Sequence, residues 1–145
     1  MNNRSASRAA TFTADEIREA LRPIASLIGK SEKAQGKLAP ETWQHAMLRD
    51  NLLALRISSA LMDPEKAGAD RFAPDDFKQA LPALVSMIGR TEKAHEKFAA
   101  GTSQHSLLRN RLKALRIAEA LVQAAADRRR TPKKGQRERT DRTSG

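Results

Sequence analysis

Two clusters of basic side chains recur 60 residues apart in this chain of 145 residues, and their spacing suggests a binding chemistry. On a helix, which turns about 100° per residue, the members of one cluster fall within about 40° of one another, beside an apolar stripe. Guanidinium groups arranged in this way can bind phosphates or carboxylates. The two clusters are His45, Arg49 and Arg56, and His105, Arg109 and Arg116.

A second interpretation assigns the same arginines to the stability of the fold. Glu32 and Glu92 occupy matching positions in the two halves of the chain, so they are available to pair with arginines of a neighbouring helix. The two interpretations differ in where the basic side chains point. A continuous exposed stripe favours binding to nucleic acid. Arginines that pair with internal carboxylates favour a bracing role, which leaves other helix faces or the tail to recognise a protein partner.

A further basic segment lies at the C-terminus. Residues 127–145 hold 8 Lys and Arg against 3 Asp and Glu, whereas residues 12–126 are close to balanced, with 17 against 14. The segment contains no large apolar residue, so we expect a disordered tail. Such an arm binds polyanions by counterion release, with an affinity that falls steeply with salt. Its candidate contact residues are Arg128, Arg129, Arg130, Lys133 and Lys134.

Motifs for catalysis and for metal binding are weak. The pair Glu92 and His95 has the Glu-x-x-His spacing of di-iron helical bundles, but Gln35 replaces the histidine in the first half, so the pair has no counterpart. The absence of cysteine excludes thiolate ligands, thiol nucleophiles and disulfides. No serine lies in a Gly-x-Ser-x-Gly motif, and the sequence has no glycine-rich phosphate loop. We therefore expect a protein that is not an enzyme and carries no metal or cofactor.

The elements that would position these side chains are repeated. Residues 12–62 align with residues 72–122 without a gap, and 24 of the 51 aligned positions are identical, which indicates an internal duplication. Each copy has the apolar periodicity of two amphipathic helices joined by a short turn. Thr13 and Glu16 predict a capping box at the start of the first helix. Thr42 and Thr102 are the expected N-caps of the second helix in each copy.

Single residues modify this scheme. Pro23 falls inside the first helix of its copy, and Pro82 falls close to the matching place, so we expect a bend or a division there. Gly29 and Gly89 are isolated glycines within the same helices, which suggests a close approach of helices. Trp43 has no aromatic counterpart, since Ser103 replaces it, and we expect a lone tryptophan beside a turn to belong to the core.

A two-helix hairpin cannot bury its apolar face alone, whereas two hairpins can bury theirs against each other. The sequence therefore predicts an all-α fold: a four-helix bundle built from two tandem copies of a helical hairpin, related by an approximate two-fold. We expect one domain over residues 12–126, with a linker at residues 63–71 between the repeats. Residues 1–11 and 127–145 are predicted to be disordered termini.

Composition points to a binding protein. The net charge is +10 with a pI of about 10.7, which makes a polyanion a natural partner. The sequence shows neither a signal peptide nor an apolar run long enough to span a membrane, so we expect a cytoplasmic protein. The hypothesis from sequence is a small helical protein that binds nucleic acid non-specifically through its basic helix faces and tail. The alternative is a protein-interaction module, an adaptor or inhibitor for an acidic partner, and a homo-oligomer is compatible with either.

Overall fold

Four α-helices make up the described part of the chain, which has no strand. The computed structural model describes residues 12–63, 68 and 71–144, and describes side chains as far as residue 129. The predicted N-terminal tail and most of the predicted linker lie outside these residues. The helices are α2 (Ala14–Gly36), α3 (Trp43–Met62), α4 (Pro74–Glu96) and α5 (Ser103–Ser144). The predicted all-α class is confirmed.

Short-range hydrogen bonds fix where the helices begin. The backbone N–H of Glu16 donates to Thr13 Oγ1 at 3.0 Å, and the N–H of Thr13 donates to the Glu16 carboxylate at 2.9 Å. This is the predicted capping box of α2. The corresponding helix α4 has alanine at the N-cap, and the Asp76 carboxylate accepts the Ala73 N–H at 2.9 Å.

The helices α3 and α5 begin in the same way. Thr42 Oγ1 accepts the N–H of His45 at 3.2 Å, and Thr102 Oγ1 accepts the N–H of His105 at 3.1 Å. Both threonines were the predicted N-caps. The caps set the register in which each histidine–arginine cluster enters its helix.

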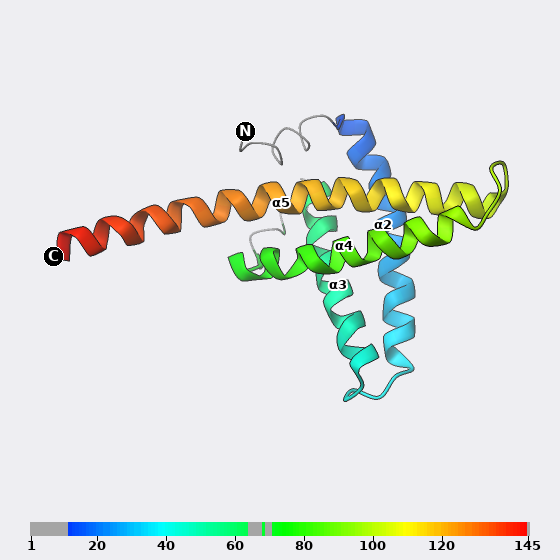
Figure 1. Cartoon of the computed structure of the whole chain (residues 1–145), viewed down its shortest axis with the longest axis horizontal. Helices are drawn as coiled ribbons and strands as arrows, with labels where there is room; N and C mark the ends of the chain where they lie inside the picture. Colours follow the sequence, from blue (N-terminus) through cyan, green and yellow to red (C-terminus); the bar gives the residue numbers. More distant parts are fainter. Residues whose placement is uncertain (1–11, 64–67, 69–70, 145) are drawn as a thin grey trace.

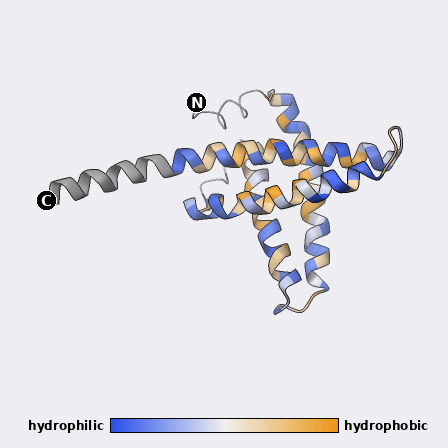
Figure 2. Cartoon of the chain, in the orientation of Figure 1, coloured by the Kyte–Doolittle hydropathy of each residue, from blue (hydrophilic) through white to orange (hydrophobic). Residues whose placement is uncertain are grey.

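The helices pair in two hairpins, α2 with α3 and α4 with α5, and the hairpins cross each other (Figure 1). Contacts between α3 and α4, between α2 and α5, and between α3 and α5 join them into a bundle. The predicted bundle is therefore confirmed, while the two-fold relation between its halves stays a prediction. Figure 2 shows apolar and polar residues interspersed along each described helix, as expected for helices that bury one side.

The core draws on matching positions of the two repeats. Leu55 and Leu115 are 0% and 1% exposed, and Ile24 and Leu84 are both fully buried. Neither Pro23 nor Pro82 divides its helix, since α2 and α4 each continue through the proline for 23 residues in total.

Three expectations from the sequence are wrong. Trp43 is 70% exposed and lies outside the core. A Cβ atom added to Gly29 or Gly89 would meet no atom within 4 Å, so these glycines do not serve a close approach of helices. The basic tail was placed from residue 127, yet α5 continues through it.

The packing of α5 beyond residue 126 explains the last correction. Ala124, Ala125 and Ala126 are buried, and one turn later the guanidinium carbon of Arg129 lies 4.3 Å from the ring centroid of Phe77. A cation–π contact of this kind holds the helix against α4 past the predicted boundary. Helix α5 as a whole ends at Ser144.

Candidate nucleic-acid interface

Helix α5 carries most of the positive charge of the protein. It holds 12 Lys and Arg against 4 Asp and Glu, and the net charge of the whole chain is +10. The other helices are each within one charge of neutral: 4 basic against 4 acidic residues in α2, 2 against 1 in α3, and 3 against 4 in α4. Among the four helices, the excess of basic residues is thus concentrated along one helix.

Two arginines of the predicted clusters brace the hairpins. Arg56 Nη2 donates to Glu32 Oε2 at 2.5 Å, and Arg116 Nη2 donates to Glu92 Oε2 in the second hairpin. All four side chains are about half exposed. The structural interpretation therefore holds for these two arginines, and each ion pair ties a hairpin's two helices together.

The next pair of arginines differs between the hairpins. Arg49 and Arg109 are both exposed. Arg49 Nε lies 3.9 Å from the carboxylate of Asp50, but Asn110 occupies the matching position beside Arg109. Arg109 makes no ion pair or hydrogen bond with the described residues, so its guanidinium is free to bind a ligand.

Arg109 lies in a groove on α5 with other basic side chains. The groove has a volume of about 560 Å³, and Arg109, Lys113 and Arg116 line it with a single carboxylate, Glu119. Lys113 and Arg116 already pair with Glu16 and Glu92, so among the described residues Arg109 is the cation of this groove that remains for a negatively charged ligand.

The histidines of the clusters are not both available as cations. The imidazole rings of His95 and His105 stack with their centroids 4.1 Å apart. Burial lowers the pKa of His105, and the neighbouring His95 and Arg109 lower it further, so His105 is neutral at pH 7. His45 has no such neighbour, because Gln35 replaces the second histidine and donates to the His45 carbonyl at 3.2 Å.

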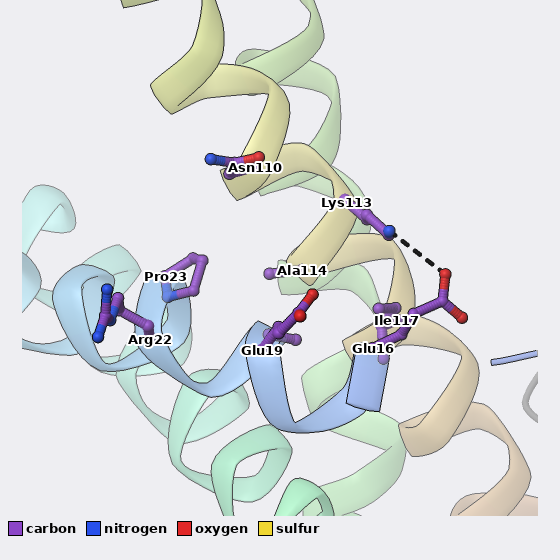
Figure 3. Close-up of a pocket in the computed structure, with 9 residues that line it drawn as sticks. Glu16, Glu19, Arg22, Pro23, Asn110, Lys113, Ala114 and Ile117 are labelled. Carbon is purple, nitrogen blue, oxygen red and sulfur yellow. Dashed lines mark ion pairs between the residues drawn. The ribbon is translucent and has the colours of Figure 1, made fainter. Parts of the chain in front are cut away.

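The side of α5 that faces α2 is lined by two carboxylates, Glu16 and Glu19, and two cations, Arg22 and Lys113. In the groove of about 230 Å³ between these helices, Lys113 Nζ lies 3.3 Å from Glu16 Oε2, and Glu19 lies near the same groove (Figure 3). The N–H of Thr13 and then Lys113 hold the pKa of Glu16 below its usual value. Since its cations are balanced by carboxylates, this side offers a polyanion no excess of positive charge.

The predicted tail residues lie on the last part of α5. Arg128 is exposed, whereas Arg129 is partly buried against Phe77. The side chains of Arg130, Lys133 and Lys134 lie outside the described residues, and only their positions on α5 are placed.

The candidate binding residues chosen from the sequence did not include Arg111. The candidates were chosen because both repeats share them, and Asn51 stands at the position of Arg111 in the first repeat. A search for basic residues present in one repeat alone would have found it, together with Lys113, which replaces Leu53.

Comparison of the chain with known protein families, with curated proteins and with solved structures gave no match. Among the described residues, no cluster of three or more His, Asp or Glu side chains could hold a metal ion. None of the helices, over its described residues, is long and apolar enough to cross a lipid bilayer.

Proposed function

We propose that this protein binds nucleic acid without sequence preference along helix α5. The observation that carries the proposal is the distribution of charge: α5 holds 12 basic and 4 acidic residues, and each of the other helices is nearly neutral. Binding of basic side chains to phosphates releases condensed counterions, which supplies affinity independently of base sequence.

The chemistry of α5 favours the phosphate backbone over the bases. The helix contains no Phe, Tyr or Trp, so it offers no platform for stacking unpaired bases. Its accessible guanidinium groups include those of Arg109 and Arg128, both exposed. A line of cations on one helix suits a backbone whose charges are regularly spaced.

The test is the salt dependence of binding to a mixed-sequence duplex DNA and to RNA, measured by fluorescence anisotropy with the full chain. Arg109→Gln is expected to lower the slope of log K against log salt by about 0.9, the contribution of one phosphate contact to duplex DNA. The matched control is Arg49→Gln on α3, which should leave the slope unchanged. Absence of binding by the unaltered chain at low salt, or equal effects of the two substitutions, would contradict the proposal.

A second variant tests the C-terminal part of α5. Replacement of Arg128, Arg130, Lys133 and Lys134 together by glutamine should reduce both the affinity and the slope by more than Arg109→Gln does, because more phosphate contacts are lost. A variant that binds as tightly as the unaltered chain would restrict the interface to the groove around Arg109.

A protein partner is a second candidate, favoured by one exposed apolar surface. Trp43 is 70% exposed and lines a groove of about 520 Å³ with Met47 and Pro82. Exposed tryptophan is typical of protein interfaces. If this surface joins two copies of the chain, Trp43→Ser, which copies Ser103 of the second repeat, should shift sedimentation equilibrium towards the monomer. A chain that is monomeric before substitution would rule out self-association through Trp43.

A further inference from the structure

We propose that a cavity at the crossing of the two hairpins binds a small oxyanion, namely a phosphate group, through Arg111 and Arg90. The cavity has a volume of about 250 Å³, and all four helices contribute to its lining. Its polar side chains are Ser31, Asn51, Arg90, Thr91 and Arg111. The site is separate from the groove around Arg109, and the inference does not depend on binding of nucleic acid.

Arg111 provides the first observation. Its Nη2 atom is shielded from solvent and has no hydrogen-bond partner in the described structure. A guanidinium carries a full charge and is protonated at any physiological pH. Such an N–H group is costly to leave without an acceptor, and an anion bound by Arg111 would supply one.

Asn51 provides a second, independent observation from the opposite hairpin. It is only 6% exposed and lines the same cavity, and its side chain makes no hydrogen bond with the described residues. A carboxamide has two N–H donors, so Asn51 can donate to an anion that already contacts Arg111.

The charge of the cavity indicates the chemical class of the ligand. Its lining includes two arginines and no Asp or Glu. Arg90 donates from Nη1 to Ser86 Oγ at 3.0 Å, which leaves further N–H groups of its guanidinium for a ligand. Two guanidinium groups from neighbouring helices, with a carboxamide between hairpins, suit the several acceptor oxygens and the charge of a phosphate.

The hydroxyl groups of the cavity complete this donor set. Thr91 Oγ1 donates its proton to the carbonyl of Met87 at 2.7 Å, so it cannot donate to an anion. Ser31, at the matching position of the first repeat, makes no hydrogen bond with the described residues and can donate. The repeats therefore contribute different groups to one site: serine and asparagine from the first, and two arginines from the second.

The test uses the full chain and inorganic phosphate. Isothermal titration at constant ionic strength is expected to show saturable binding of one phosphate per chain, and the melting temperature should rise with phosphate concentration relative to chloride. Arg111→Met should weaken phosphate binding by about tenfold or more, because a charge-assisted hydrogen bond is lost. In chloride, the melting temperature of Arg111→Met should not fall, because a desolvated charge has been removed.

Matched variants distinguish specific binding of phosphate in the cavity from non-specific attraction to a basic protein. Arg49→Gln removes an exposed arginine that lines neither this cavity nor the groove around Arg109, and it should leave phosphate binding unchanged. Arg90→Gln alters an exposed residue and should reduce binding even if Arg111→Met fails to fold. Absence of saturable binding by the unaltered chain, or equal losses in the Arg49 and Arg111 variants, would overturn the proposal.

The source of the phosphate group is settled by competition. If Arg111→Met and saturating phosphate both weaken binding of duplex DNA at constant ionic strength, a backbone phosphate occupies the cavity. If neither changes DNA binding while free phosphate still binds, the ligand is a small phosphate compound. Both results support the oxyanion site, and phosphate titration alone decides it if DNA does not bind.

Discussion

The two hairpins share the residues that stabilise their fold but differ in the charge of their surfaces. The N-caps of their second helices, their Arg–Glu pairs and their buried leucines match position by position, yet α3 has one basic residue more than its acids, and α5 has eight more. Most of the additional charge lies in residues 123–144, which have no counterpart in α3, and within the repeats Lys113 replaces Leu53 and Arg111 replaces Asn51. Duplication therefore preserved the residues that hold a hairpin together and allowed the outer positions of its second helix to change.

The largest expected difference between the two hairpins concerns the stability of their cores. Phe77 is fully buried, while its counterpart Ile17 is only partly buried. Phe77→Ala should lower the free energy of unfolding by about 3–5 kcal/mol, because it removes a buried ring and leaves a cavity. Ile17→Ala should cost about 1–2 kcal/mol, since less apolar area leaves water at that position. Urea denaturation of both variants measures the difference, and equal losses would show that the two hairpins have equivalent cores.

A smaller effect should be the same in both hairpins. Gly29 and Gly89 lie within α2 and α4, and a Cβ at either position would meet no other atom. Gly29→Ala and Gly89→Ala should each raise the free energy of unfolding by about 0.5–1 kcal/mol, because alanine loses less backbone entropy in a helix. Thermal unfolding measures both. A loss of stability in one variant alone would reveal a crowded environment in that hairpin.

The smallest effect is a pH dependence confined to the second hairpin. The pKa of His105 is lowered from 6.5 in the folded protein, so the unfolded chain takes up this proton at a higher pH than the folded one. The free energy of unfolding therefore falls as the pH drops from 6.5 towards the folded pKa. His95→Gln copies Gln35 of the first hairpin and removes one cause of the shift.

The measurement compares unfolding by urea at about pH 7.5 and about pH 5.5, a range that brackets the unfolded pKa of histidine. The loss of stability between the two should be smaller in His95→Gln than in the unaltered chain. His45→Gln in the first hairpin is the control for removal of a histidine from a similar position. An unchanged loss in His95→Gln would mean that burial alone lowers the pKa of His105.

Local signals in the sequence were sufficient for the helices and their pairing. Thr13, Thr42 and Thr102 mark helix starts because a capping hydrogen bond spans only three residues. The pairing of Arg56 with Glu32 was available as one interpretation, because the matching glutamates of both repeats could be read from the alignment.

The features that the sequence did not predict depend on how the two hairpins cross. The exposure of Trp43 and the contact of Arg129 with Phe77 are set by packing between segments far apart in the chain. No local periodicity reports such contacts. Arg111 escaped notice for a similar reason: its shielded Nη2 results from the meeting of all four helices, while its sequence neighbours suggest an ordinary exposed arginine.

The connection between the hairpins has a consequence for how the chain assembles. Eleven residues, 63–73, join α3 to α4, and the two hairpins share nearly half of their sequence. A hairpin from another molecule is therefore similar enough to compete with the chain's own second half. The short tether keeps the correct half at an effective concentration of about millimolar, so exchange between chains is suppressed at any lower protein concentration. If the chain were cut at this connection, the effective concentration would be lost, and pairing of the two hairpins would depend on the protein concentration.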